Sequence, residues 1–558
     1  AFCPQSSVLT NLLGSCLLAM TAAQVLLFVA LLNLAGATAA SDEECNSSGS
    51  QQGQCKIASV IKDSNVETSA LVQSKLHLKG KISSTDDPKQ LVKPHLREFV
   101  NENTKFVHGV PIFRYHEVHA SGMEPSLLEL QEQKDWIVEF EGSCTDTGLN
   151  DVCSKFLVGE SECVLVGHPS EHGLAFLELK ASESELKELM AKKDLPCKID
   201  FTEPNTPINS IPEVDDHDPE TLLETARGVT WGIDRIDARS GLDGQYSMGS
   251  TGQGVAVYVA DTGVRCSHSE FEGRCTYAAD WTNGGGRKQE CSGGGTSCGY
   301  DRQGHGTHCA GTVAGKTYGV ARKATIKALK VLGDNGSGSL AGIIGSVDYV
   351  LQKTGPRVWS ASLGGKGQPA SAKTAIDKAV AGGVVVSVAG GNDRDDACKY
   401  APAFVPSAIT VAASAKGDTV ASFTNYGKCT DIWAPGKDIT SAGIKSDSST
   451  DTMSGTSMAC PHVSGGAAVV LGYNPSFSPT QVLDTLLKYA SKDKIQRNKP
   501  NTPNKLLYVE ANMGGGNGGG GNGGGAPGGP GCDGAPGPAG PGGPAGPAGP
   551  PGPPGPPR

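Results

Sequence analysis

The sequence lacks several features that would point to particular partners. Acidic side chains outnumber basic ones, for a net charge of −10, and no basic stripe marks a surface for nucleic acid. The 17 cysteines include no Cys-X-X-Cys pair of the kind that holds zinc, so disulfides in an oxidising compartment explain them better. Beyond residue 40, no stretch is long and apolar enough to span a membrane. Nucleic acid, structural zinc and an internal membrane segment are therefore not expected.

The first 40 residues contain no Lys, Arg, Asp or Glu. An apolar run at 25–34 precedes Ala37-Thr38-Ala39, a small-X-small pattern typical of a signal-peptide cleavage site. Residues 1–40 are therefore predicted to be a signal peptide, with Met20 as an alternative start, and the protein is expected to be secreted. The alternative is a transmembrane anchor, because residues 12–40 are long enough to span a bilayer.

Three regions precede the largest part of the chain. Residues 41–130 are polar and irregular and suggest no function. Residues 131–205 combine apolar strands with an amphipathic helix, which predicts a small α+β domain. Residues 206–227 are rich in Pro and Asp and are predicted to be a linker. Within the α+β domain, the predicted strands are 136–140, 174–179 and 198–202, and the predicted helix is 183–193.

The largest region, residues 228–512, alternates short apolar strands with helices. This pattern predicts a parallel sheet covered on both faces, and in such sheets chemistry gathers at the carboxyl ends of the strands. The predicted strands are 255–260, 325–332, 358–362, 384–389 and 409–413, and the predicted helices are 305–313, 340–352, 370–381, 456–471 and 478–490.

The end of the chain has a separate composition. Residues 513–524 are rich in Gly and Asn, and from 525 to 555 glycine occupies every third position, giving eleven triplets of collagen type within residues 525–558. A collagen-like tail predicts a trimer. The alternative is an extended linker, because a single chain cannot form the triple helix.

Three segments carry the groups that a hydroxyl nucleophile requires. Asp261 ends an apolar strand, His305 begins a helix among small residues, and Ser457 begins another helix after a glycine turn. Peptide hydrolysis by a hydroxyl needs a base for its proton, an acid that holds the base, and donors for the oxyanion. Taken singly, Asp261 can cap a loop instead. His305 and His308 together can bind a metal ion, although no carboxylate at helical spacing completes a zinc site.

The order of three motifs resembles that of the subtilase family. The motifs are Asp261-Thr262-Gly263, His305-Gly306-Thr307-His308 and Gly455-Thr456-Ser457-Met458-Ala459, and Phe271-Glu272-Gly273-Arg274 looks like the proteinase K branch. The resemblance covers about residues 231–509. It implies an α/β fold, a subtilisin-like three-layer domain with a mainly parallel central sheet.

By this resemblance the protein is expected to be a secreted serine endopeptidase that cuts protein or peptide substrates. Asp261 would orient His305, His305 would be the general base, and Ser457 the nucleophile. Asn392, after Gly390-Gly391, would donate to the oxyanion together with the N–H of Ser457. His308 and His462 match non-catalytic positions and are interpreted as structural.

The resemblance also implies a substrate cleft. No carboxylate occurs among its matching residues, so broad cleavage after apolar or aromatic residues is expected. Asp393, Asp395 and Asp396 are interpreted as part of a solvated loop. The cleft residues are Gly336, Ser337, Gly338, Ser362, Leu363, Gly364, Ala389, Gly390 and Gly391.

A structural calcium ion and several disulfides are further expectations. Asp431 matches a calcium-binding carboxylate, with the carbonyls of Pro406 and Ala408 as companions; the alternative is a capping Asp. Cys398 and Cys429 match a disulfide of aqualysin-like relatives, and Cys309 would stay a free thiol near His305. Proximity in the sequence suggests Cys266–Cys275 and Cys291–Cys298.

Residues 131–205 resemble the inhibitor-type propeptide of these enzymes, through Trp136-Ile137-Val138 and Gly173-Leu174-Ala175-Phe176. This implies a self-processing zymogen whose own propeptide blocks the cleft until a cut within 206–227. Two other interpretations stay open. The chain can be a silenced or self-inhibited binding protein on the same fold, or the collagen-like tail can be its functional end.

Overall fold

The computed structural model describes residues 87–117, 129–211, 213–214, 229–247, 250–283, 286–292, 296–510 and 513, all of which belong to one compact unit. The predicted signal peptide at 1–40 and the predicted collagen-like tail at 525–558 lie outside these residues. We call residues 87–205 the N-terminal domain and residues 229–510 the C-terminal domain. No described helix combines the length and the apolar character needed to cross a membrane.

The C-terminal domain is built on an 11-stranded sheet in the order β10-β9-β11-β8-β13-β15-β17-β19-β23-β22, with β18 beside β17. Neighbouring strands from β9 to β23 run parallel, as the sequence predicted, and β10, β18 and β22 add antiparallel edges. The strands are β8 (Ala256–Asp261), β9 (Cys275–Asp280), β10 (Gln289–Glu290), β11 (Thr325–Lys330), β13 (Arg357–Ala361), β15 (Val385–Ala389), β17 (Ile409–Ala415), β18 (Thr419–Val420), β19 (Ile432–Pro435), β22 (Ser491–Lys492) and β23 (Lys505–Leu506).

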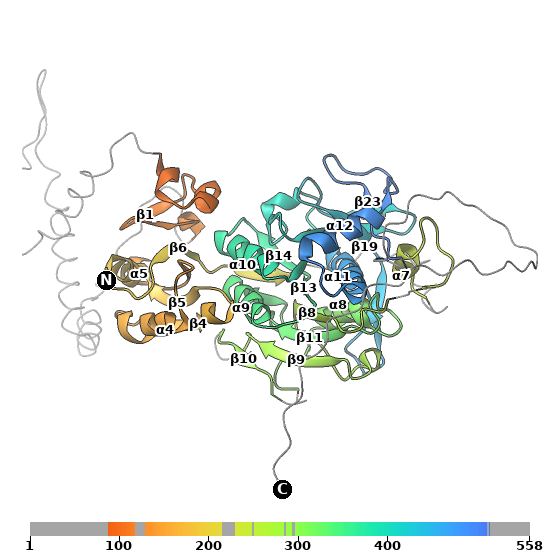
Figure 1. The fold of residues 1–558 in the computed structure, drawn as a ribbon, viewed down its shortest axis with the longest axis horizontal. Coiled ribbons are helices and arrows are strands. Elements are labelled where there is room, and N and C mark those ends of the chain that lie inside the picture. The colour runs from red at the N-terminus through yellow and green to blue at the C-terminus, as the bar shows by residue number, and fades with distance from the viewer. Residues whose placement is uncertain are drawn as a thin grey trace, which may run out of the picture. The chain divides into compact units, whose positions relative to one another are not determined.

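Helices cover both faces of this sheet (Figure 1). Along β8, Val257 and Val259 pack toward α8 and α11, whereas Tyr258 and Ala260 pack toward α9 and α10. This alternation follows from the two-residue period of a strand, and it produces the predicted three-layer α/β domain. The helices are α7 (Trp231–Ile236), α8 (His305–Ala314), α9 (Leu340–Leu351), α10 (Ala370–Ala381), α11 (Thr456–Tyr473) and α12 (Pro479–Tyr489).

The N-terminal domain has a six-stranded sheet in the order β1-β2-β6-β3-β5-β4. Its core packs Trp136 and Leu179 against Leu186 and Leu189 of α5, whose start is fixed by a capping box between Ser182 and Glu185. The elements are β1 (Lys105–Val107), β2 (Val110–Ile112), β3 (Gln133–Phe140), α4 (Asp146–Asp151), β4 (Glu162–Val166), β5 (Phe176–Ser182), α5 (Glu183–Ala191) and β6 (Ile199–Pro204).

Two sequence-based predictions about this part of the chain are wrong. Residues 87–117, predicted to be irregular, supply β1 and β2, and Ile112 of β2 pairs with Thr202 of β6. The start of the predicted linker at 206 is the strand β7 (Pro207–Ser210). These strands of three or four residues are too short to show an alternating pattern. β2 and β7 form because distant strands offer free edges, and β1 forms because it pairs with β2 in a hairpin.

β7 belongs to a separate four-stranded sheet in the order β12-β7-β14-β16. It runs antiparallel to β12 (Ser337–Ser339) on one side and to β14 (Leu363–Lys366) on the other. The fourth strand of this sheet, β16, spans Tyr400–Ala401. A separate hairpin consists of β20 (Ile439–Ala442) and β21 (Thr450–Met453).

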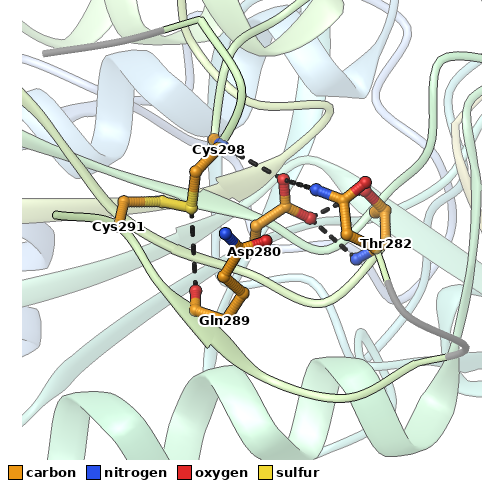
Figure 2. Close-up of a disulfide and its surroundings, with 7 residues drawn as sticks. Asp280, Thr282, Gln289, Cys291 and Cys298 are labelled. Atoms are coloured by element: carbon orange, nitrogen blue, oxygen red, sulfur yellow. Dashed lines mark hydrogen bonds between the residues drawn. A yellow bond between two sulfur atoms is a disulfide. The ribbon is translucent and has the colours of Figure 1, made fainter. Parts of the chain in front are cut away.

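Five disulfides link described cysteines, and Cys309 and Cys460 are free and buried. In Figure 2, the Cys291–Cys298 disulfide closes the loop after β10, where Asp280 accepts hydrogen bonds from Thr282 and from the N–H of Gly299. The N-terminal domain holds Cys144–Cys197 and Cys153–Cys163; the C-terminal domain holds Cys266–Cys275, Cys291–Cys298 and Cys398–Cys429.

Candidate active site

Asp261 and His305 meet where a strand ends and a helix begins. Asp261 is the last residue of β8 and His305 the first of α8, and the His305 Nδ1 atom lies 2.8 Å from Asp261 Oδ1. Gly306 allows this approach, because a Cβ there would lie 2.1 Å from the carbonyl oxygen of Gly263. Burial lowers the pKa of His305, but Asp261 and Cys309 together outweigh burial and raise that pKa well above its ordinary value.

Ser457 lies in the first turn of α11 and is buried. Its hydroxyl donates to the carbonyl of Ser362 at 3.3 Å, and its own carbonyl accepts from Ser362 Oγ at 2.9 Å. The Cys309 sulfur bridges the groups, at 3.4 Å from the Ser457 carbonyl and 4.0 Å from His305 Nδ1. Three segments that are distant in sequence therefore converge.

The Nε2 atom of His305 is buried and has no hydrogen-bond partner among the described residues. The Ser457 hydroxyl must therefore turn from Ser362 toward His305 before the two can share a proton. An imidazole whose Nδ1 is held by a carboxylate, with Nε2 left open, is prepared to accept a proton from a nearby hydroxyl.

The side chain of Asn392 lies against the start of α11. Its Oδ1 accepts hydrogen bonds from the backbone N–H and the hydroxyl of Thr456, both at 2.9 Å. Its Nδ2 lies so close to Gly455 that a Cβ there would be 2.9 Å away. These contacts fix the amide beside the residue that precedes Ser457, with its N–H₂ group at the helix start.

The predicted cleft segments lie on either side of an extended chain. Asn209 of β7 stands opposite both Ser337 of β12 and Gly364 of β14. The N–H of Ser210 donates to the carbonyl of Gly336 at 2.8 Å. The cleft therefore binds a strand through backbone hydrogen bonds on two edges, as in β-augmentation.

A cavity of about 380 Å³ opens beside this strand. Ala389, Gly390 and Gly391 line it, as the sequence predicted, together with Asp393 and Tyr400. Asp393 is exposed, as expected for a solvated loop, and it also adds to the cavity wall a carboxylate that is not among the matched cleft residues. The sequence analysis named Asp393 but did not place it on this wall.

The two other acidic residues of this loop have different contacts. Asp395 accepts from the exposed Lys399 at 2.8 Å, and this bond lowers the pKa of Asp395. Asp396 accepts from the backbone N–H of Cys398 at 3.0 Å and so caps a short turn. Neither residue lines the cavity.

Comparison with known proteins gives consistent matches over the C-terminal domain. The model of the subtilase family matches residues 252–510. The "Extracellular serine proteinase" of a Thermus species is 47% identical over 283 residues, which are 50% of this chain and 66% of that protein. The "Cuticle-degrading serine protease" of Arthrobotrys oligospora is 40% identical over 306 residues, which are 53% of this chain and 73% of that protein. The chain belongs to the subtilase family.

This subtilase also resembles the solved structure of a cold-adapted subtilisin-like serine proteinase, at 41% identity and a TM-score of 0.47, over 50% of this chain and 98% of that chain. The subtilase chain spans about two thirds of the length of the Thermus relative.

Two further histidines of this subtilase lie near the site but form structural contacts. His308 Nε2 lies 2.8 Å from the carbonyl of Ile439, and His462 Nδ1 lies 2.8 Å from the carbonyl of Met458. Burial lowers the pKa of His308 to about 3 and that of His462 to about 4. Both rings are therefore neutral at physiological pH.

Asp431, the expected calcium ligand, is a half-buried carboxylate of this subtilase. Its Oδ2 accepts from the N–H of Thr410 at 2.8 Å, two residues after Ala408. Burial raises the pKa of Asp431 to about 6, and the opposing effects of this bond and of the Lys505 charge are smaller. A half-buried carboxylate with few partners for its charge fits a hard cation, and the carbonyls of Pro406 and Ala408 would be its companion ligands. Among the described residues, only Asp261, His305 and Cys309 form a close group of His, Cys, Asp or Glu ligands.

Proposed function

We propose that this subtilase is a serine endopeptidase whose nucleophile is Ser457. The observation that carries the proposal is the 2.8 Å contact between His305 and Asp261, with His305 Nε2 left without a partner and Cys309 in contact with both His305 and Ser457. Asp261 holds the proton on Nδ1 and stabilises the imidazolium that forms. His305 Nε2 takes the proton of the Ser457 hydroxyl as it attacks the substrate carbonyl, and later gives it to the leaving amine. Water then hydrolyses the acyl-enzyme by the same route.

The oxyanion of the tetrahedral intermediate would be met by two donors. One is the backbone N–H of Ser457 in the first turn of α11, where the helix dipole also favours negative charge. The other is the amide of Asn392, whose orientation is set by its two bonds from Thr456. Donors that are oriented before the reaction cost no reorganisation when the charge develops.

The proposed specificity is broad, with a preference for apolar or aromatic residues before the cut. Support comes from the small lining residues Ala389, Gly390 and Gly391, which leave about 380 Å³ for a side chain. Asp393 on the same wall adds an acceptor for the terminal ammonium of lysine. Lysine is therefore a secondary substrate residue in this proposal.

We further propose that the N-terminal domain inhibits the enzyme in a secreted, self-processing zymogen. Glu203 of β6 accepts from the N–H groups of Ala370 and Ser371 at 3.2 and 2.9 Å, at the start of α10. Asp348 of α9 accepts from the N–H groups of His168 and Leu174. These bonds hold the N-terminal domain on two helices of the C-terminal domain while β7 fills the cleft. Trimerisation through the tail stays a hypothesis, tested by the size of the chain with and without residues 513–558.

A structural calcium ion at Asp431, with the carbonyls of Pro406 and Ala408, is a further proposal. Calcium would neutralise a half-buried carboxylate and link the segment before β17 to the residue before β19. Addition of EDTA should lower the melting temperature, and calcium should restore it. In the Asp431→Asn variant, both effects should disappear; an unchanged response in that variant contradicts the assignment.

The proposed activity is tested with purified protein, casein and a Suc-Ala-Ala-Pro-Phe reporter. The wild-type chain should hydrolyse both after removal of the N-terminal domain, and Ser457→Ala should hydrolyse neither. Ser407→Ala is the matched control, because the Ser407 hydroxyl donates to Asp377 on α10. An inactive wild-type enzyme would favour the alternative, a silenced binding protein on the same fold.

A further inference from the structure

The hairpin of β22 and β23 carries positive charge in a chain whose net charge is negative. Between residues 488 and 505 the sequence has six basic side chains and one acidic side chain, Asp493, whereas the whole chain has a net charge of −10. The excess is confined to this short segment, so the chain as a whole has no basic stripe. The six basic residues are Lys488, Lys492, Lys494, Arg497, Lys499 and Lys505.

The hairpin lies at the edge of the 11-stranded sheet that is farthest from β9 and β10 (Figure 1). Lys492 stands directly opposite Lys505 in the antiparallel pair of β22 and β23. Beyond this pair, the N–H groups of Asp493 and Ile495 donate to the carbonyl and the side-chain oxygen of Asn504, at 3.0 and 2.9 Å. The two arms of the hairpin are therefore held together beyond the paired strands.

A lysine from another loop joins the hairpin. The N–H of Gly427 donates to Thr502 Oγ1 at 2.9 Å, which holds the residue before Lys428 against the hairpin. We call the surface formed by residues 491–505 and Lys428 the hairpin face. Its exposed cations are Lys428, Lys492, Lys494 and Arg497.

The cations of the hairpin face form no ion pair with the described part of the chain, whereas elsewhere in the same domain Arg235 pairs with Asp418 and Lys399 with Asp395. Like charges that stand directly opposite each other destabilise a sheet. The pairing of Lys492 with Lys505 is therefore unfavourable by itself, and an anion bound beside the two ammonium groups would remove the repulsion.

Lysine on an edge strand also protects a sheet against pairing with another chain. This protection accounts for Lys492 on β22. It does not account for Lys428, Lys494 or Arg497, which lie outside the strands. A binding role explains all four exposed cations together.

The character of the hairpin face limits which polyanion it can bind. It offers no apolar side chain to a membrane, because Ile495 is 3% exposed and the exposed large apolar side chains among the described residues, Leu91 and Leu242, lie elsewhere. Tyr426 beside the hairpin has the Lys499 ammonium over its ring at 5.4 Å, which opposes stacking with a nucleic-acid base. β22 and β23 have two residues each, too few for a ribbon that enters a DNA groove.

We propose that the hairpin face binds an acidic polysaccharide, a polymer that carries carboxylate or sulfate groups on a flexible chain. Separate lysines on flexible stems suit such a polymer, because each ammonium is a point charge that requires no fixed geometry. Binding of this kind is electrostatic and would hold the exported protein on an anionic matrix. The proposal does not rest on the peptidase activity, because none of these residues belongs to the candidate active site.

The test measures binding of the full chain to immobilised heparin and polygalacturonate, with Ser457→Ala in every protein to prevent self-cutting. The neutral variant carries Lys492→Gln, Lys494→Gln and Arg497→Gln. The charge-conserving variant carries Lys492→Arg, Lys494→Arg and Arg497→Lys. The matched control removes the same charge from exposed lysines elsewhere in the domain, through Lys316→Gln, Lys323→Gln and Lys445→Gln.

The parent chain should bind both polymers at low ionic strength and elute by about 1 M NaCl, where the Debye length is about 3 Å. The neutral variant should bind at least about tenfold more weakly, the combined effect of three exposed charge pairs, and the other two triple variants should stay within about twofold of the parent. Failure of the parent chain to bind, or equal weakening of the neutral variant and either other triple variant, overturns the proposal.

A second variant keeps the proposal testable if the neutral variant does not fold. Lys428→Glu changes a residue outside the hairpin and should weaken binding about fivefold, because it replaces an attraction by a repulsion. Unchanged binding of Lys428→Glu overturns the proposal.

Two other polyanions test the class of partner. Double-stranded DNA and phosphatidylglycerol vesicles should each bind more weakly than heparin at equal ionic strength and equal concentration of charge. The reason is that a rigid duplex or a flat bilayer meets only part of the hairpin face, whereas a flexible polymer can follow it. Equal or tighter binding of DNA or of vesicles overturns the assignment to a polysaccharide.

Discussion

Glu178 is a buried carboxylic acid on the face of the N-terminal domain that meets the C-terminal domain. Its neighbours on that face, Ile137 and Phe176, share an apolar cluster with residues of α9. Its Oε1 accepts from Asn205 Nδ2 at 2.7 Å, and Asn205 Oδ1 accepts in turn from the N–H of Ala341 at 3.0 Å. Burial, with a smaller contribution from the Asp135 charge, raises the pKa of Glu178 to about 7.

This shift makes the stability of the precursor depend on pH. Because the folded-state pKa lies above the unfolded value of 4.5, the protonated acid is favoured in the folded chain. The stability is complete below pH 4.5 and is lost as the pH rises through about 7. Above pH 7 the loss amounts to about 3 kcal/mol. Glu178→Gln keeps the Oε1 acceptor without charge, so it should stabilise the precursor by up to about 3 kcal/mol at pH 8 and by less than about 0.5 kcal/mol at pH 4.5.

The assay is urea unfolding of the Ser457→Ala precursor, with and without Glu178→Gln, at both pH values. Fluorescence reports on Trp136, which is fully buried in the core of the N-terminal domain. Glu162→Gln is the matched control, because Glu162 lies on β4 of the same sheet with an exposed side chain. An equal effect of Glu178→Gln at the two pH values, or a pH-dependent effect of Glu162→Gln, would refute the reasoning.

Three other outcomes are expected from the site and its supports. Asn392→Ala should lower kcat with little change in KM, by the factor of about 100 to 1000 known for loss of such a donor in a subtilisin; a change confined to KM would argue against its role. Asp393→Asn should lower kcat/KM for a lysine reporter about fivefold, the value of a partly exposed ion pair, and leave the Phe reporter unchanged. Removal of the Cys398–Cys429 disulfide, which closes a loop of 31 residues, should destabilise the chain by about 3–4 kcal/mol in urea unfolding; a loss below about 1 kcal/mol would contradict the loop-entropy estimate.

The sequence was sufficient to predict the helices and strands that are specified by capping residues and by local apolar patterns. The helix predicted at 340–352 is observed as Leu340–Leu351, because Ser339 caps its start and its apolar residues follow the helical period. The strand predicted at 255–260 is observed as Ala256–Asp261 for the same kind of reason, an unbroken apolar run. β2 and β7 were missed because they become strands by pairing with edges distant in the chain, and β1 was missed because it pairs only with β2.

The candidate site likewise contains residues that the sequence predicted and one whose position it did not predict. Asp261, His305 and Ser457 were found because each stands in a motif at the end of a regular element. The position of Asp393 on the cavity wall was not found, because it depends on how the loop after β15 folds back over Asn425, whose Oδ1 accepts from the Asp393 N–H at 2.9 Å. Long-range packing of this kind has no local pattern in the sequence.

The disulfides have one more consequence. Two lie within the N-terminal domain and three within the C-terminal domain, and within the described parts of the chain none joins the two. If the proposed zymogen is cut between them, the N-terminal fragment becomes a separate molecule whose local concentration falls from that of a tethered group to that of the bulk medium. Dilution after export would then free the enzyme, whereas crowded storage before export would keep it silent.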